Sequence, residues 1–461
     1  MHRTRTVRSL LLLLVLALVA AGCGRSEDTG GGGGNGGGNG GNGGNGGNGN
    51  GDASGVVDPG DCPDNDTAGI SDDNVITLAS SFPQSGLTAA FAQISKGYKA
   101  YFDKVNDAGG VEIGGESYTI EVVDKDDEYD AAKTVQNINE LVGTDGANAF
   151  AVFNVVGTAN NVALREDLGS NCVPNVFAGT GSPVWGNPDY PWTIGSTLAP
   201  YTVESKAFAD YLATENPTAK VAMLVQSDDF GKAYEEGFKN AIEGTDITIV
   251  EVQNYAPGTS EVASQMTALA ASGADTFFNG STLLACPTAL EAAKSEGWEA
   301  TTFVSGTCIS KTLMGIAGQN ADGVLATTNI KDPLNPAFAD DPAMTEYRQT
   351  LTDFAADDVD PENGIVAYGY TQAALLVEIL KTLDAPTRSG LVNAMYELEG
   401  LTAGLLLDGV TVNTSADDRF LAEDVQLIQY DADNAYFTNV GDVLDFEGTT
   451  TELTPPELIE S

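Results

Sequence analysis

The sequence predicts an α/β protein with two doubly wound parallel-sheet lobes. Short apolar segments rich in β-branched residues alternate with segments of helical periodicity from Val75 to Phe177. The same alternation starts again after Pro200 and continues to Val304. Short strands alternating with helices are typical of βαβ units, whose strands form a parallel sheet. Two such series within 461 residues indicate two lobes.

The first series contains four predicted strands and three predicted helices. The first helix carries Leu87, Phe91 and Ile94 at helical spacing, and Gly109 and Gly110 end it. The expected strands are 75–79, 118–123, 149–153 and 173–177, and the expected helices are 86–107, 131–142 and 159–168.

The second series repeats this pattern, and a mostly helical region follows it. Strands are expected at 221–225, 247–252, 276–278 and 302–304, with helices at 203–213, 234–242, 262–271 and 289–296. Further helices are expected at 344–354, 366–383 and 391–398, and β-like segments at 405–412, 425–430 and 435–440. The tail 447–461 is expected to be disordered.

The charge and the histidine content exclude several classes of function. There are 66 acidic against 21 basic residues, a formal net charge of −45, so the chain is no general nucleic-acid binder. The single histidine is His2, in a segment that export would remove. Histidine-dependent catalysis and histidine-ligated zinc are therefore not expected. We expect no enzyme, no catalytic residue, no metal and no cofactor; an exported hydrolase that uses carboxylates is the weakest alternative.

The N-terminus resembles a bacterial lipoprotein signal. Arg3, Arg5 and Arg8 precede an apolar stretch at 10–19, which is too short to span a bilayer. Small residues then lead directly to Cys23. The resemblance implies removal of the signal peptide 1–22 and lipidation of Cys23, which would anchor the protein to the outer face of the cell membrane. An ordinary signal peptide and a soluble secreted protein are the alternative.

Residues 23–61 are expected to form a disordered tether. This segment is dominated by Gly and Asn and cannot bury apolar surface. Beyond Cys23, four cysteines remain, and an even number in an exported chain suggests two disulfides with three possible connectivities.

The order of the predicted segments resembles that of the solute-binding proteins of branched-chain amino-acid (Leu/Ile/Val) ABC transporters. Four stretches carry the resemblance: VNDAGGV at 105–111, DKDD at 124–127, VPNVFAGT at 173–180 and DDFGK at 228–232. It extends from about Val75 to Val440. The resemblance implies a type I periplasmic-binding-protein fold, in which two lobes are joined by a three-crossover hinge.

The same resemblance implies the lobe boundaries and the disulfide pairing. The crossovers are expected near 197–200, 326–331 and 407–419. Lobe I would then comprise 62–197 and 329–408, and lobe II 198–328 and 409–446. Because each pair falls within one lobe, the expected disulfides are Cys62–Cys172 and Cys286–Cys308.

Ligand contacts are expected where strands end and helices begin. Free N–H groups at these turns can bind an anion, and hydroxyl groups add directional hydrogen bonds. The turns in the first series carry Ser81, Phe82, Thr158, Ala159 and the stretch 178–180. The resemblance implies that Thr158, Ala178 and Thr180 hold the carboxylate and amino ends of a ligand. Alternatively, the two threonines only cap helices.

In the second series, the resemblance points to Phe230, Thr282 and Thr307. Phe230 matches a tyrosine that packs on the ligand, although it could instead be a core residue. No Glu lies near Thr307 in the sequence, where an amino-acid binder usually has one. This departure favours a small acid, an amide or an aromatic compound over an amino acid.

Together these features predict an extracytoplasmic solute-binding protein that delivers a small molecule to the permease subunits of an ABC transporter. The ligand would be a branched-chain or other hydrophobic amino acid, an amide, or a small carboxylate or aromatic acid. A ligand-sensing receptor subunit of the same fold is the main alternative. The expected partners are the ligand, the permease and, through Cys23, the membrane, but no nucleic acid.

Replacing Cys23 by Ser tests the lipid anchor. Cys23→Ser removes the acceptor thiol, so the variant should appear in the medium or remain as unprocessed precursor. Cell fractionation with mass spectrometry of the N-terminus measures both outcomes. A variant that is processed and retained at the membrane like the parent would show that Cys23 is not the anchor.

Overall fold

The computed structural model describes residues 55–62 and 65–460, and it consists of two parallel-dominated sheets flanked by helices. The predictions for the signal peptide, for Cys23 and for the tether up to residue 54 lie outside the described residues. The end of the expected tether is ordered, because the backbone N–H and C=O of Val57 both bond to the side chain of Asn393, at 3.0 Å each. The prediction of disorder is thus wrong for residues 55–61.

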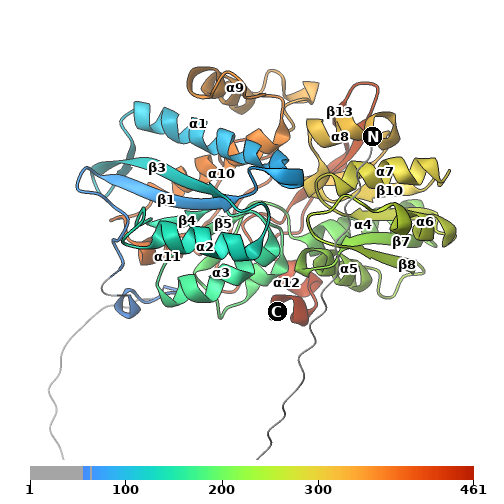
Figure 1. The fold of residues 1–461 in the computed structure, drawn as a ribbon, viewed down its shortest axis with the longest axis horizontal. Helices are drawn as coiled ribbons and strands as arrows, with labels where there is room; N and C mark the ends of the chain where they lie inside the picture. The colour runs from blue at the N-terminus through green and yellow to red at the C-terminus, as the bar shows by residue number, and fades with distance from the viewer. Residues whose placement is uncertain (1–54, 63–64, 461) are drawn as a thin grey trace, which may run out of the picture. The chain divides into compact units, whose positions relative to one another are not determined.

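The first sheet has six strands in the order β2-β3-β1-β4-β5-β6. Only the β2–β3 pair is antiparallel. The helices α1 and α10 cover one face of this sheet and α2 and α3 the other (Figure 1). The strands are β1 (Val75–Phe82), β2 (Val111–Ile113), β3 (Glu116–Asp126), β4 (Ala151–Phe153), β5 (Asn175–Ala178) and β6 (Thr193–Gly195). The helices are α1 (Gln93–Asp107), α2 (Ala131–Val142), α3 (Thr158–Ser170), α9 (Pro342–Phe354), α10 (Gly364–Leu380) and α11 (Arg388–Met395).

The second sheet has seven strands in the order β13-β12-β11-β10-β9-β7-β8. Its strands are parallel except β12, which runs antiparallel to both neighbours. The strands are β7 (Lys220–Gln226), β8 (Thr248–Tyr255), β9 (Thr276–Gly280), β10 (Thr301–Val304), β11 (Leu325–Thr328), β12 (Val425–Asp431) and β13 (Tyr436–Leu444). The helices are α4 (Tyr201–Glu215), α5 (Asp229–Ala241), α6 (Ala263–Ala271), α7 (Ala285–Ser295) and α8 (Lys311–Ala317).

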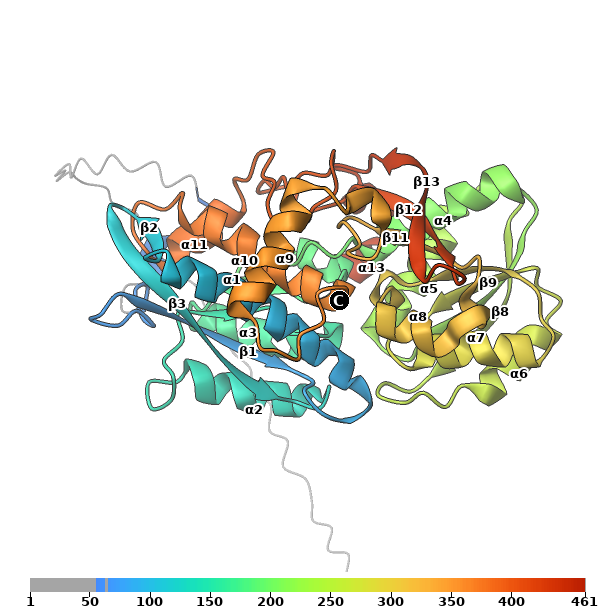
Figure 2. The same cartoon turned by 90° about the horizontal axis from the view of Figure 1, so that it is seen from above.

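These elements confirm the predicted α/β class of two doubly wound lobes. The chain passes between the two sheets three times: from β6 to α4, from β11 to α9, and from α11 to β12 (Figure 2). Both expected disulfides, Cys62–Cys172 and Cys286–Cys308, are present. The exact residue bounds of the lobes stay a prediction.

Two predictions about the C-terminal third are wrong. The segment 405–412 is not a strand, because Leu406 and Val412 form only isolated bridges. The tail is ordered to residue 460 and contains α12 (Thr450–Leu453) and α13 (Pro456–Ile459). The tail packs against the protein because Leu453 joins an apolar cluster with residues of α4 and β12. The many threonines of the tail had suggested that it would be exposed to solvent.

Glycines allow α1 and α10 to cross at close range. A Cβ atom at Gly97 would overlap the carbonyl oxygen of Val366, and one at Gly369 would overlap that of Ile94. Each helix therefore needs glycine where the other backbone passes. Among the described residues, no helix is both long enough and apolar enough to cross a membrane.

The crossing of α1 and α10 can be tested with Gly97→Ala. The added methyl group meets backbone atoms that cannot move alone, so we expect a loss of about 1–3 kcal/mol in the free energy of unfolding. Urea unfolding measures the change. Gly315→Ala in α8 is the control, because a Cβ there meets open space. That control should gain up to about 1 kcal/mol from helix propensity, and equal effects of the two substitutions would contradict the close crossing.

Candidate functional site

A cavity of about 120 Å³ lies where strand ends from both sheets meet. From the first sheet, Val156 follows β4 and Gly179 follows β5. From the second sheet, Thr307 follows β10 and Asn329 follows β11. The carboxyl ends of parallel strands are the usual place for a ligand in open α/β sheets.

All three segments that pass between the sheets contribute to this cavity. Leu198 belongs to the first crossing, Ile330 to the second and Leu407 to the third. A relative movement of the two sheets would therefore change the shape of the cavity.

Most of the cavity wall is apolar. The apolar side chains come from α1 and the turn before it, from the N-terminal end of α10, from the crossings, from the turn after β10, and from β12 and β13. Such a wall suits the apolar body of a small ligand. These side chains are Phe91, Ile94, Leu198, Ile309, Ile330, Phe338, Ile365, Ile428 and Phe437.

The polar part of the wall contains Glu204, which the sequence analysis missed. Glu204 lies in the first turn of α4 and is 2% exposed. Its Oε2 accepts hydrogen bonds from the Gly306 N–H (2.9 Å) and from the Tyr234 hydroxyl (3.1 Å). The fold thus brings a glutamate next to Thr307, where we expected none. The only hint of this role in the sequence is that Glu204 stands among the apolar residues of a helix whose neighbouring side chains are buried.

The charges at the cavity leave no cation free among the described residues. Burial raises the pKa of Glu204 to about 8, and no ion pair compensates its charge within the described chain. Lys331 also lines the cavity, but it pairs with Asp341 (2.7 Å) and Asp408 (2.9 Å). Burial likewise raises the pKa of Asp332, another lining residue. An anionic ligand would therefore find no unpaired positive charge here.

The predicted ligand residues of the first lobe do not line the cavity. The hydroxyl groups of Thr158 and Thr180 lie 2.7 Å apart, and the Tyr201 hydroxyl donates to Thr180 at 3.1 Å. Ser81 donates to Asp127 at 2.9 Å. The remaining predicted residues of this lobe, Phe82, Ala159 and Ala178, are not part of the cavity wall either. Their contacts with a ligand stay predictions.

In the second lobe, Thr307 after β10 lines the cavity, and Phe230 of α5 does not. The ring of Phe230 packs against Tyr201 and Tyr234, with centroids 5.1 and 5.4 Å away, inside an apolar core cluster. This placement agrees with the core alternative, and a contact between Phe230 and a ligand stays a prediction.

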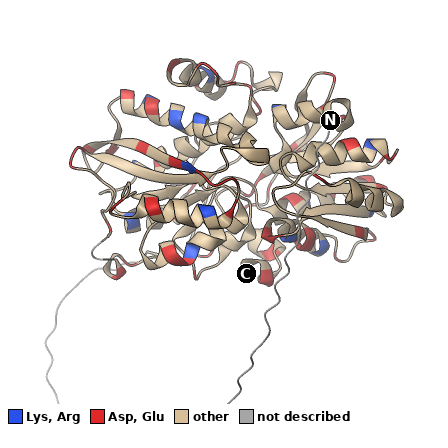
Figure 3. Cartoon of the chain, in the orientation of Figure 1, with Lys and Arg blue, Asp and Glu red and all other residues tan. Residues whose placement is uncertain are grey.

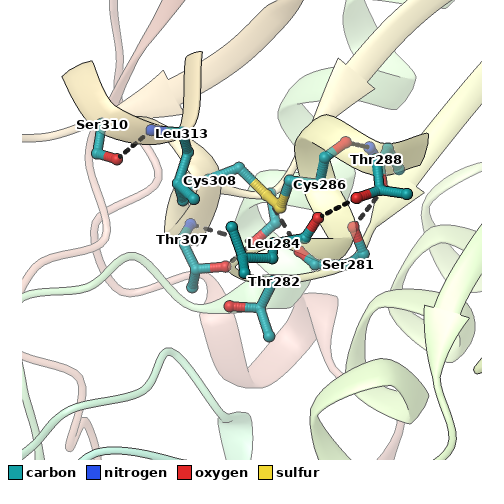
Figure 4. Close-up of a disulfide and its surroundings, with 12 residues drawn as sticks. Ser281, Thr282, Leu284, Cys286, Thr288, Thr307, Cys308, Ser310 and Leu313 are labelled. Atoms are coloured by element: carbon teal, nitrogen blue, oxygen red, sulfur yellow. Dashed lines mark hydrogen bonds between the residues drawn. A yellow bond between two sulfur atoms is a disulfide. The ribbon is translucent and has the colours of Figure 1, made fainter. Parts of the chain in front are cut away.

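A disulfide joins the two turns that carry Thr282 and Thr307 (Figure 4). Cys286 lies at the start of α7, and Cys308 directly follows Thr307. Thr282 lines a second, much smaller hollow together with Tyr129, which lies in the turn between β3 and α2. The covalent link therefore limits how far these two turns can move apart.

The raised pKa of Glu204 predicts that the stability of the protein depends on pH. Its pKa rises from an ordinary value of 4.5 to about 8 in the folded state. Between these values the folded state keeps a proton that the unfolded state has lost, so stability falls as the pH rises, by about 1.4 kcal/mol per pH unit at most. Glu204→Gln should flatten this fall.

Urea unfolding from about pH 5 to pH 8 measures the difference between the two slopes. Glu215→Gln, at the exposed end of the same helix, should keep the wild-type slope. The same slope in Glu204→Gln would mean that Glu204 is already ionised at neutral pH.

Comparison with known proteins places these features in a family. The family described as periplasmic binding protein matches residues 75–435. The chain is 28% identical over 272 residues to the Leu/Ile/Val-binding protein homolog 3 of Brucella melitensis, which covers 58% of this chain and 70% of the relative.

Solved structures with the same fold include a substrate-binding periplasmic protein from Ralstonia solanacearum, at a TM-score of 0.71 and 25% identity. That match covers 79% of this chain and all of the other. A fatty acid ABC transporter substrate-binding protein from Thermomonospora curvata has a TM-score of 0.70 at 21% identity, over 85% of this chain and 98% of the other. Because the family match spans most of the chain, the protein belongs to the periplasmic binding proteins, with a type I fold.

Proposed function

We propose that the protein captures a small, largely apolar molecule in the cavity between its two sheets and delivers it to the permease of an ABC transporter. The observation that carries this proposal is the position of the cavity, which all three crossings and strand ends of both sheets line. A ligand held there contacts both lobes at once.

Capture works by a shift between open and closed arrangements of the lobes. A ligand stabilises the closed arrangement only as far as it binds that arrangement more tightly. Thr307 and Glu204 belong to one side of the cavity, and Val156 and Ile365 to the other. Closure would bring both sets against the ligand, and the permease would recognise the closed form.

The lining favours a ligand with an apolar body and a polar end that faces Glu204 and Thr307. A hydrophobic amino acid, amine or amide fits this arrangement. A simple carboxylate fits less well, because Lys331 is already paired with Asp341 and Asp408. The relatives show that this fold does not by itself decide the ligand, since their names refer both to Leu/Ile/Val and to fatty acid.

Lipidation of Cys23 would complete this function. The family places the protein outside the cytoplasm, and an anchor on Cys23 would keep it beside a membrane permease. The Gly/Asn-rich segment would then act as a spacer of about 30 Å.

Ligand binding can be tested by thermal unfolding of the wild type with leucine, isoamylamine and isocaproate. These probes share one apolar chain and differ in their charged ends. A ligand at a hundred times its Kd stabilises the folded state by about 2.7 kcal/mol. We expect leucine or isoamylamine to raise the Tm and isocaproate to have the smallest effect.

Ile365→Trp fills the cavity from α10 and should abolish the rise in Tm. Val250→Trp is the matched control, because Val250 is exposed on β8 and remote from the cavity. A ligand that still binds Ile365→Trp with wild-type affinity would place the binding site elsewhere. If none of the three probes binds, mass spectrometry of molecules released from the denatured protein identifies the ligand class directly.

A further inference from the structure

Three carboxyl groups meet in the second lobe, at a position that ligand capture does not use. Glu423 lies two residues before β12, Asp418 lies in the loop before it, and Glu447 follows β13. One carboxylate oxygen from each lies within 4.8 Å of the other two. Glu423 is fully buried, and the other two are half-buried.

No positive charge compensates this cluster within the described part of the chain. None of the three carboxylates forms an ion pair there. Arg419 is the neighbour of Asp418 in sequence, but its guanidinium lies over the ring of Tyr396, 4.8 Å from the centroid. Glu423 instead accepts backbone N–H groups from Gly448 (2.6 Å) and Thr450 (2.8 Å). Asp418 accepts the backbone N–H of Phe420 at 3.3 Å. Backbone N–H groups carry only partial charges, so they cannot neutralise three neighbouring carboxylates, one of which is fully buried.

A buried hydroxyl group points independently to a ligand at this place. Thr450 is 0% exposed, and its Oγ1 has no hydrogen-bond partner of acceptable geometry. The side chain of Thr450 lies beside the Glu423 carboxyl and lowers the pKa of that group, against the larger raising effect of burial. A fully buried hydroxyl without a partner is costly, and its oxygen is a suitable ligand for a hard cation.

We propose that Asp418, Glu423, Glu447 and the hydroxyl of Thr450 form a binding site for one calcium ion. Calcium binds oxygen ligands at about 2.3–2.6 Å, so two of its ligands lie at most about 5 Å apart. The oxygen separations in the cluster match this size. The donor set is all oxygen, which suits calcium and disfavours zinc and copper. Magnesium demands a smaller, octahedral shell and keeps several waters.

The ion would tie the third crossing to the C-terminal segment. Asp418 and Glu423 belong to the chain between α11 and β12, while Glu447 and Thr450 belong to the segment that packs on α4. Calcium would thus hold the third crossing against the C-terminal segment of the second lobe. This role is separate from the cavity, because none of the four residues lines it.

Calcium binding is tested on the full exported chain after treatment with EDTA. Thermal unfolding is followed in about 5 mM CaCl₂, in MgCl₂ and in NaCl of equal ionic strength; extracellular calcium modules have Kd values of about 0.1–1 mM. We expect calcium to raise the Tm by several degrees, with one calcium ion per chain by calorimetry. Magnesium should do less, and sodium should reproduce only general screening.

The variant Glu447→Gln separates a calcium site from simple repulsion. In EDTA the variant should be at least as stable as the wild type, because one repulsive charge is gone. In calcium the order should reverse, and calcium binding should weaken at least about tenfold. Thr450→Val should also weaken calcium binding without changing the charge. Asp442→Asn, an exposed acid on β13, is the control and should bind calcium like the wild type.

Two outcomes would overturn the proposal. One is a wild-type Tm that responds equally to calcium, magnesium and sodium. The other is a Glu447→Gln variant that is more stable than the wild type both in EDTA and in calcium, which would mean that the cluster is a set of repelling carboxyl groups only.

Discussion

The three passages of the chain between the sheets are bonded to one another, and the rest of the structure depends on this junction. Asn329 in the second crossing donates to the carbonyl of Thr197 in the first, and its own carbonyl accepts the N–H of Leu407 in the third at 3.0 Å. The Gln372 side chain of α10 donates to the Thr197 hydroxyl at 2.7 Å. The junction thereby couples α10 to all three crossings. Any movement of one lobe must turn about this point, and the cavity lies next to it.

Acidic groups have two distinct roles in the molecule. Most Asp and Glu residues lie on the outside of helices and strands around both sheets, where Lys and Arg are fewer (Figure 3). Water solvates those charges, and they keep the protein soluble. A few carboxyl groups of the described residues are buried instead, among them Glu204 at the cavity and Glu423 beside the C-terminal segment. Burial without a counter-charge is costly, so these few positions are where a ligand or a cation has most to gain.

The sequence predicted the turns near the candidate site, but it did not predict which side chains line the cavity. Strand ends follow from local patterns, so the turns at Thr158, Thr180 and Thr307 were located correctly as turns. Whether a hydroxyl at such a turn is free depends on its neighbours in space. Thr158 and Thr180 satisfy each other, whereas Thr307 opens onto the cavity. Glu204 was missed because its partner Gly306 lies about a hundred residues away in sequence.

The sequence by itself determined the α/β class, the two lobes and the four cysteines beyond Cys23 that suffice for two disulfides. These features depend on periodicity within single helices and strands, and on counting, which need no knowledge of distant contacts. Only the tertiary structure decided that the tail packs through Leu453, that Glu204 reaches the cavity and that Glu447 meets Glu423. Each of these contacts joins segments that are far apart in the chain, so burial and pairing there follow from the packing of whole elements and not from any local pattern.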